Sequence, residues 1–496
     1  MAEKLILAID QGTTGTKALV MDQDLNPRAE CTLNFKQHYP QPGWVEHDPN
    51  EIWQTVVKSI QQVVQKVDAK KIIGIGITNQ RETVCFWNKK TGEPYTDAIV
   101  WQDRRTADQC ARLKEKGLEP KFQEATGLLL DPYFSGTKVA WALENWGVLK
   151  NAQQKGELAV GTIDSYLVAR LSGGRAHVTE PSNASRTLCF HLTKHQWDSE
   201  LCSALSVPQN VWPEVKPSIG KFAVTQGVPG LPDGIPISGI LGDQQSALLG
   251  QACLEEGTAK CTYGTGSFIL LNTGKKPVHS RHRLVTTIAW ALNDQDYTYA
   301  LEGSVFIAGA ATQWIRDGLE LIKDSSEIED LARSVKDTDG VVFVPALTGL
   351  GAPYWNPHAT GMITGLTRGT TKAHIARATL EGIAFQNADI LMAMQKDIAR
   401  PLTQLNVDGG ACVNNLMMQF QSDILGVQLK RPQLKETTSI GAVFAAGIGV
   451  GLWSDLAQVK KSWKEDRAFV PQMAETQKQQ QLKKWANAIQ RVMLPS

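Results

Sequence analysis

Short apolar runs alternate with longer amphipathic segments along the first half of the chain. The runs are rich in β-branched residues, which is typical of strands, and the longer segments have helical spacing. The predicted strands cover residues 5–9, 18–21, 72–77, 83–87 and 235–240, and the predicted helices cover 49–67, 105–116, 136–146 and 244–250. This alternation predicts an α/β fold.

A second set of strands and helices follows. The predicted strands lie within 257–272 and at 284–292, 298–302, 341–345 and 405–407, and the helices at 304–322, 372–399, 415–425 and 439–449. Residues 475–492 have helical spacing with many glutamines and lysines, which predicts a surface helix. Because the Pro- and Gly-rich interval 229–236 precedes the second set, we place a boundary near Gly250 and predict domains 1–250 and 251–496.

Two glycine turns lie between apolar runs. Residues 7–20 contain an apolar run that ends in Asp10, a Gly/Thr turn and a second apolar run, and residues 259–272 repeat this order. Each predicts a β-hairpin whose tip offers amides and hydroxyls to a phosphate, and Asp10 suits the accompanying Mg²⁺. The first is not a Walker loop, because no Gly-Lys-Ser/Thr follows. Ordinary glycine turns are the alternative, but the pair suggests two similar domains that hold one nucleotide between them.

A third glycine turn follows the predicted strand 405–407. Asp408 precedes Gly409 and Gly410, and Asn414 precedes the helix predicted at 415–425. Glycines there allow the backbone to approach a flat group such as a purine. The turn therefore adds a candidate site for the base of a nucleotide.

Composition and charge exclude several classes of function. The formal net charge is +1 and the basic residues are scattered, which does not favour nucleic acid or an acidic membrane surface. The eight cysteines include no Cys-x-x-Cys pair, so we expect buried free thiols in a reducing compartment. The histidines lack the spacing of metal ligands, so we expect them to be structural or surface residues. The apolar run 5–9 is too short for a signal peptide, and 440–453 is too short for a membrane span. We expect a cytoplasmic protein without membrane insertion.

Five further motifs narrow the prediction. They are Gln-Arg-Glu-Thr at 80–83, Tyr-Phe-Ser-Gly-Thr-Lys at the start of 133–141, Gly-Asp-Gln-Gln at 242–245, Gly-Leu-Gly-Ala-Pro-Tyr-Trp at 349–355 and the glycine-rich segment 361–369. The three glycine turns resemble those of the actin-like ATPase superfold. With the five motifs, the chain resembles the FGGY family of carbohydrate kinases and, within it, the branch that phosphorylates glycerol. The resemblance extends from about residue 4 to about residue 453.

The resemblance implies a fold and an activity. The fold is two similar actin/ribonuclease H-like α/β domains with an active-site cleft between them. The activity is ATP-dependent phosphorylation of glycerol to sn-glycerol 3-phosphate, the first step of glycerol catabolism. The implied cofactors are ATP and Mg²⁺, and the implied partners are glycerol and ATP/ADP, without nucleic acid. Relatives are commonly dimers or tetramers, so a homodimer or homotetramer is expected.

Asp243 is the predicted catalytic residue. It lies between the predicted strand 235–240 and the predicted helix 244–250, where a carboxylate can reach into a cleft. Phosphoryl transfer needs a group that accepts the proton of the attacking alcohol, and the resemblance assigns this general-base role, with in-line transfer of the γ-phosphate, to Asp243. A helix N-cap is the alternative for this residue. The resemblance also places Asp10 and Asp243 near Mg²⁺, with water between.

Arg81 and Glu82 are predicted to bind substrate hydroxyls. Adjacent side chains of a strand point to opposite faces, so both reach one ligand only if the chain leaves the strand at residues 79–80. Together they offer donors and acceptors, which suits a polyol. A surface ion pair, worth about 0–1 kcal/mol, is the alternative. The resemblance adds Tyr133, Asp243 and Gln244 for the hydroxyls, and Phe268 and Trp101 for the carbon skeleton.

The resemblance also implies a set of nucleotide contacts. They are Thr13, Thr14, Gly15, Lys17, Thr265, Gly266, Gly309, Gln313, Gly410 and Asn414. Gly15 stands where a serine is frequent and Lys17 where an arginine is frequent, which removes one hydroxyl and one bidentate fork. Loop 227–235 has no Lys or Arg, so we do not expect the sugar-bisphosphate inhibition of some relatives. We also do not expect histidine phosphorylation, because the nearest histidines are His191 and His195.

Two other functions remain open from the sequence. A kinase for a longer sugar, such as a pentulose or gluconate, would share the fold, although Arg81 and Glu82 argue against it. An actin-like nucleotide switch would share the phosphate turns but would not need the residues predicted to bind a substrate, which are Arg81, Glu82, Tyr133 and Asp243. Glycerol-independent ATP turnover would favour the switch.

Overall fold

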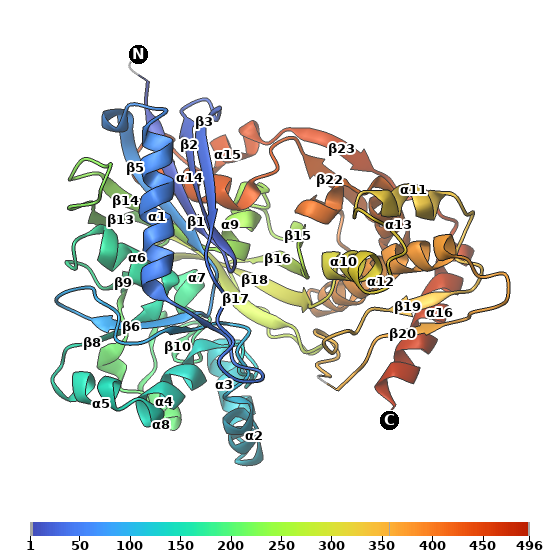
Figure 1. Cartoon of the computed structure of the whole chain (residues 1–496), viewed down its shortest axis with the longest axis horizontal. Helices are drawn as coiled ribbons and strands as arrows, with labels where there is room; N and C mark the ends of the chain where they lie inside the picture. The colour runs from blue at the N-terminus through green and yellow to red at the C-terminus, as the bar shows by residue number, and fades with distance from the viewer. Residues whose placement is uncertain (1–2, 357, 495–496) are drawn as a thin grey trace.

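Two mixed β-sheets form the frame of the structure, a computed structural model that describes residues 3–356 and 358–494. The first sheet has the order β13 (Ile219–Val224), β14 (Pro236–Gly242), β5 (Ile72–Asn79), β1 (Leu5–Gln11), β2 (Gly15–Asp22) and β3 (Pro27–Asn34). The second has the order β17 (Val285–Asn293), β18 (Asp296–Val305), β16 (Ser267–Gly274), β15 (Ala259–Tyr263), β21 (Gln404–Asp408), β22 (Gln428–Pro432) and β23 (Glu465–Phe469). Figure 1 shows the first sheet on the left and the second from the centre to the right.

The two sheets repeat one topology. In the first, the hairpin β1–β2 continues into antiparallel β3, and on the other side β5 and β14 run parallel to β1 before antiparallel β13. In the second, the hairpin β15–β16 continues into antiparallel β18, and β21 and β22 run parallel to β15 before antiparallel β23. This repeat confirms the prediction of two similar α/β units.

Residues 5–9 of strand β1 are all apolar because helices cover both faces of the strand. Leu5, Leu7 and Ile9 pack in a buried cluster that includes residues of α1 (Pro49–Val64). Ile6 and Ala8 point the other way and pack in a cluster with residues of α14 (Thr437–Gly449). A strand that is buried on both faces has no alternation of polar and apolar residues. This packing fixes the end of β1, where Asp10 lies, and the turn that follows it.

Helix α14 connects the two units. It belongs to the second half of the chain, yet it packs on β14, β5 and β1 of the first sheet and against α9 (Asp243–Gly250). The approach is close: a Cβ added at Gly76 of β5 would lie 2.1 Å from the carbonyl oxygen of Ala442. The two halves of the chain are therefore interlocked next to Asp243.

The other elements cover the sheets or form small additions. The remaining helices are α2 (Ala107–Glu115), α3 (Glu119–Thr126), α4 (Ser135–Asn145), α5 (Gly147–Gln154), α6 (Ile163–Leu171), α7 (Pro181–Ala184), α8 (Ser199–Leu205), α10 (Gly309–Asp317), α11 (Glu327–Arg333), α12 (Lys372–Asp397), α13 (Asn415–Leu425), α15 (Leu456–Ser462) and α16 (Glu475–Met493). Short sheets pair β4 (Glu46–His47), β7 (Ala98–Ile99), β6 (Val84–Asn88) and β8 (Leu158–Thr162); β10 (Phe190–His191) with β11 (Gln196–Trp197); β12 (Glu214–Val215) with β9 (Val178–Thr179); and β19 (Val342–Val344) with β20 (Met362–Thr364). In the described part of the chain, every helix is too short or too polar to span a bilayer. Seven of the eight cysteines are buried, and Cys31 is half-exposed.

One sequence prediction needs correction. The helix predicted at 304–322 is wrong in its bounds, because α10 covers only Gly309–Asp317 and β18 continues to Val305. Ser304 and Val305 pair with Phe268 and Ser267 in the β16–β18 ladder, and this long-range pairing overrides the local helical spacing. The strand predicted at 341–345 is confirmed as β19, which pairs with β20 in a separate small sheet.

Candidate active site

The loop after β5 brings Arg81 and Glu82 to the same side of the chain. β5 ends at Asn79, and the next amide, of Gln80, donates to the Gln11 carbonyl at 2.7 Å. Glu82 has a φ of 61°, so the chain turns sharply there. The predicted exit from the strand at residues 79–80 is confirmed. Arg81 is 2% exposed and Glu82 1%, so the alternative of a surface ion pair is wrong.

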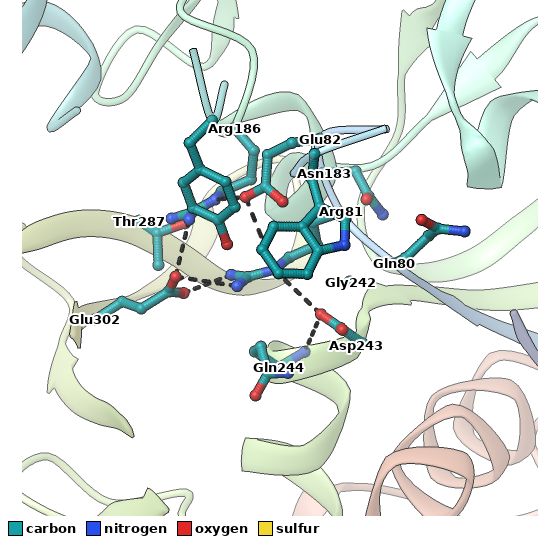
Figure 2. A network of polar contacts seen from close by, with 12 residues as sticks. Gln80, Arg81, Glu82, Asn183, Arg186, Gly242, Asp243, Gln244, Thr287 and Glu302 are labelled. Carbon is teal, nitrogen blue, oxygen red and sulfur yellow. Dashed lines mark hydrogen bonds and ion pairs between the residues drawn. The ribbon is translucent and has the colours of Figure 1, made fainter. Parts of the chain in front are cut away.

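A buried network of charges surrounds this loop (Figure 2). Arg81 lies between Glu302 of β18 on one side and Asp243 on the other: its Nη2 donates to Glu302 Oε1 at 3.0 Å, and its Nε lies 3.1 Å from Asp243 Oδ1. Arg186 donates through Nη2 to Glu302 Oε1 at 2.8 Å and through Nε to Glu82 Oε1 at 2.6 Å. The network therefore joins residues of both sheets, because Glu302 belongs to the second sheet and Arg81 follows a strand of the first.

The two glutamates of the network differ in their electrostatic environment. Burial by itself would raise the pKa of Glu302, but Arg186 and Arg81 outweigh burial and hold the pKa at about 2. Burial raises the pKa of Glu82, and Arg186 and Arg81 compensate only in part. Glu302 bonds to both guanidinium groups, whereas the carboxylate of Glu82 hydrogen-bonds to one described residue, Arg186. Glu302 is thus the carboxylate that stabilises the two buried arginines.

Asp243 is the first residue of α9, directly after β14. Its Oδ1 accepts a hydrogen bond from the Gln244 amide at 2.7 Å and faces Arg81. The side chain is 30% exposed, and Oδ2 makes no hydrogen bond to any described residue. The N-cap position belongs to Gly242, so the N-cap alternative for Asp243 is wrong. One oxygen of the carboxylate is fixed, and the other is available to a ligand.

Three aromatic side chains form one wall beside the network. The ring of Trp101 packs edge-on against Tyr133 at 5.6 Å and against Phe268 at 6.3 Å, so residues of both halves contribute. The indole Nε1 of Trp101 donates to Thr13 Oγ1 at 2.9 Å. The structure therefore brings the two predicted wall residues, Trp101 and Phe268, together with the predicted hydroxyl contact Tyr133, and it connects them to the first glycine turn.

A buried lysine holds the Tyr133 turn in place. Lys138 Nζ donates to the carbonyl oxygens of Tyr133 at 2.8 Å and Phe134 at 3.4 Å, and also to that of Pro132. Burial lowers the pKa of Lys138 to about 8. Three carbonyls on one ammonium fix the backbone of the turn, which in turn fixes the Tyr133 ring.

Asp10 of β1 and Lys17 of β2 pair across the hairpin, next to the first glycine turn. Ser439 of α14 donates to Asp10 Oδ2 at 2.9 Å. Burial, and then the nearby Asp243 carboxylate, raises the pKa of Asp10 to about 7. Lys17 Nζ lies 2.6 Å from Glu436 Oε2, so this predicted nucleotide contact is engaged in an ion pair at the start of α14. Of the turn hydroxyls, Thr14 is exposed and Thr13 is half-buried.

The residues around Asp10 suit a divalent cation. Two neighbouring carboxylates in a largely enclosed position repel each other, and a cation that keeps most of its waters would relieve this repulsion. Hard carboxylate oxygens are also the ligands that Mg²⁺ prefers. Asp10 and Asp243 therefore have the chemistry that the predicted magnesium site requires.

We expect Gly15→Ser to destabilise the first hairpin, although serine is frequent here in the family that the sequence resembles. An added Cβ would lie 2.9 Å from the Leu33 carbonyl oxygen and 2.7 Å from Asn34 Oδ1. Since that carbonyl belongs to β3, the strand must shift, and overpacking costs about 1–3 kcal/mol. At Gly12 the added atom would meet only the Gly15 carbonyl at 3.4 Å, so Gly12→Ser is the matched control. Thermal unfolding without nucleotide compares the two variants, and equal midpoints would contradict the expectation.

The second glycine turn packs against the start of α10. The amides of Ala308 and Ala310 donate to the Thr265 carbonyl at 2.8 and 3.0 Å, and the Gly309 amide donates to the Gly264 carbonyl at 3.0 Å. A Cβ at Gly266 would lie 2.3 Å from the Val305 carbonyl oxygen, so only glycine fits. The predicted contacts at 265, 266 and 309 thus lie together, and the Thr265 side chain is exposed.

The third glycine turn approaches the second. Gly409 has a φ of 88°, and an added Cβ would lie 2.4 Å from the Tyr263 carbonyl oxygen. Gly410 is exposed beside it, and Gln313 is exposed on α10. Asn414 Oδ1 accepts from the Met417 amide at 2.9 Å, so this residue also caps α13. These positions do not test whether the residues bind a nucleotide, so their nucleotide roles stay predictions.

The sequence prediction missed Arg186, Glu302 and Lys260, which all contact predicted site residues. Lys260 Nζ donates to Gln244 Oε1 and lies in β15. A charged residue inside a predicted apolar strand was the available signal for Glu302 and Lys260, since buried charges are paired or functional. Arg186 gave no comparable signal.

Comparison with known proteins also divides the chain into two matched domains. Residues 5–250 match the N-terminal domain of the FGGY family of carbohydrate kinases, and residues 259–450 match its C-terminal domain. The chain is 52% identical over 489 residues to a glycerol kinase of Bdellovibrio bacteriovorus, covering 98% of this chain and 99% of that protein. It is 51% identical over 491 residues to a glycerol kinase of Myxococcus xanthus, covering 98% and 99%. A solved glycerol kinase of Plasmodium falciparum with ADP superimposes with a TM-score of 0.94 at 38% identity, covering 100% of this chain and 99% of that one.

Proposed function

Because the chain belongs to the FGGY family of carbohydrate kinases, we propose that it transfers the γ-phosphoryl group of ATP to glycerol and forms sn-glycerol 3-phosphate. Similarity to glycerol kinases along almost the whole chain supports this substrate. The proposal rests mainly on four polar atoms of the site. Glu82 Oε2, the Tyr133 hydroxyl, Asp243 Oδ2 and Gln244 Nε2 make no hydrogen bond to any described residue, although the charges around them are paired.

These four atoms suit the hydroxyls of a small polyol. A carboxylate oxygen accepts, an amide nitrogen donates, and a phenol does either, so together they match groups that both donate and accept. The aromatic rings of Trp101 and Phe268 would cover the carbon skeleton. Polar atoms that are otherwise well positioned and lack a partner favour a ligand that supplies one.

In the proposed reaction, Asp243 acts as the general base. Its Oδ2 takes the proton of the attacking hydroxyl while the hydroxyl oxygen forms a bond to the γ-phosphorus. The bond from that phosphorus to the bridging oxygen of the β-phosphate breaks, and ADP leaves with the electron pair. Arg81 and the Gln244 amide hold Oδ1 so that Oδ2 faces the substrate. Positioning and charge neutralisation supply most of the catalysis in such transfers.

ATP would lie across the three glycine turns. Thr13 and Thr14 would contact the phosphates from the first turn, and Thr265 and Gly266 from the second. Gly309, Gln313, Gly410 and Asn414 would contact the nucleoside. Asp10 and Asp243 would hold Mg²⁺ through water, and the ion would neutralise the charge of the β- and γ-phosphates.

An ADP-forming assay over a set of polyols tests the proposal. We expect glycerol to support ADP release with equal formation of a phosphorylated polyol, and xylulose, gluconate and erythritol to support much less. Preference for xylulose or gluconate would instead assign a kinase for a longer sugar. ADP release that needs no polyol, with no phosphorylated product, would assign a nucleotide switch.

A further inference from the structure

Lys260 is a fully buried cation that the proposed mechanism does not use. It lies in β15, is 0% exposed, and its Nζ donates to Gln244 Oε1 and to Thr262 Oγ1, the latter at 2.9 Å. Burial lowers the pKa of Lys260, while the Asp408 and Asp243 carboxylates favour the charged form. A buried charge is costly, so its placement against an amide of the site needs a reason.

The contact with Lys260 fixes which end of the Gln244 amide faces the ligand. An ammonium group has three donors and no acceptor, so only the carbonyl oxygen of the amide can face it. The NH₂ group must then point away from Lys260, and in the described part of the chain it donates to no residue. The amide cannot flip without placing two donors against each other.

We infer that Lys260 is a positioning residue that fixes Gln244 as a hydrogen-bond donor to one hydroxyl of the acceptor. This inference rests on the proposed function and adds a rule of specificity to it. The hydroxyl at Gln244 must accept a hydrogen bond, whereas the hydroxyl at Glu82 Oε2 must donate one. A free amide would offer either end and would discriminate less between acceptors.

The contact also spans the two sheets. Gln244 belongs to α9, directly after β14 of the first sheet, and Lys260 belongs to β15 of the second. Lys260 therefore sets the polarity of the amide only when the two units are packed together, as they are here.

A double-mutant cycle in the full-length protein tests the inference. We expect Lys260→Met to raise the KM for glycerol about tenfold, which corresponds to about 1.4 kcal/mol, and to change the KM for ATP less than twofold. Gln244→Leu should raise the KM for glycerol at least as much, and Lys260→Met should add nothing in the Gln244→Leu background. Equal effects of Lys260→Met in both backgrounds, or no effect in either, would overturn the inference.

Gln244→Glu provides a second variant that does not leave Lys260 without a partner. The carboxylate pairs with Lys260, which preserves the fold, but it offers an acceptor where the amide offers a donor. We expect a rise of at least tenfold in the KM for glycerol with an unchanged melting temperature; a KM equal to that of the wild type would overturn the inference. The proposed function is tested separately, by whether the wild-type protein phosphorylates glycerol or another polyol. The KM of each variant is then compared with that of the wild type on the polyol that the wild type uses.

Discussion

Replacing Asp243 with Asn is expected to lower kcat for glycerol phosphorylation by about 10²–10⁴, the usual contribution of a general base, and to change the KM for glycerol little. An amide cannot accept the hydroxyl proton. It can still accept the hydrogen bond from the Gln244 amide, and Arg81 keeps its bonds to Glu302. The substrate residues therefore stay in place, and the loss falls on the chemical step. Steady-state kinetics in saturating ATP separates the two parameters.

Asp233→Asn is the control for Asp243→Asn. Asp233 is an exposed carboxylate in the loop 227–235, and within the described residues it accepts one hydrogen bond, from the Gly227 amide at 2.7 Å. Its substitution should leave kcat within about twofold, as for most surface changes. Near-normal turnover of Asp243→Asn would reject the role of general base.

Replacing Glu302 with Gln has the second large effect, on stability as well as on the substrate. The change removes the carboxylate that both Arg81 and Arg186 require, and breaking a buried ion pair from one side costs about 3–5 kcal/mol. We expect a melting temperature lower by roughly 5 °C or more at pH 7. The KM for glycerol should rise at least tenfold, because Arg81 and Glu82 lose their fixed positions.

The acid dependence of the Glu302→Gln variant gives an independent test. The folded pKa of Glu302, about 2, is below the ordinary value of 4.5, so its ionised form stabilises the folded protein. That stabilisation is complete above the unfolded pKa and is lost as the pH falls toward the folded pKa. The difference in melting temperature between wild type and variant should therefore be constant at neutral pH and shrink below pH 4.5. A difference that does not change with pH would contradict the ion-pair explanation.

Glu381→Gln is the matched control for Glu302. Glu381 is a buried carboxylate of α12, and its one ion-pair partner in the part of the chain that the structure describes is Arg377, at 3.0 Å within the same helix. Burial raises the pKa of Glu381 to about 7, so its ionised form does not stabilise the fold in the way that Glu302 does. We expect little loss of stability from this control and no change in the KM for glycerol.

The structure also changes how two departures from the family pattern are interpreted. Gly15 is packed against β3, which leaves no room for the serine of some relatives. Lys17 forms an ion pair with Glu436 at the start of α14, and Ser439, in the first turn of that helix, bonds Asp10. Gly15 and Lys17 therefore help to position the first turn, Gly15 through its contact with β3 and Lys17 through its ion pair at α14. This role does not depend on any contact with a nucleotide.

The sequence alone determined the features that depend on neighbouring residues. Apolar runs broken by glycines predicted both hairpins, because strand and turn preferences act over a few positions. The transition from strand to helix at Asp243 was predicted in the same way. The exit from β5 followed from geometry, since Arg81 and Glu82 cannot share a ligand within a strand. The motifs fixed the family because their order along the chain is specific.

The tertiary structure alone decided the contacts between the two sheets. Glu302 lies 221 residues from Arg81 in the chain, and Arg186 lies 104 residues from Glu82. Lys260 lies 16 residues from Gln244 but belongs to the second sheet, and no local preference records any of these pairings. The same cause extended β18 into the helix predicted at 304–322, because ladder bonds to β16 outweigh helical spacing. Packing between distant segments also places α14 on the first sheet. Burial and charge pairing between distant segments are properties of the folded chain, and so the completed site exists only in the assembled pair of units.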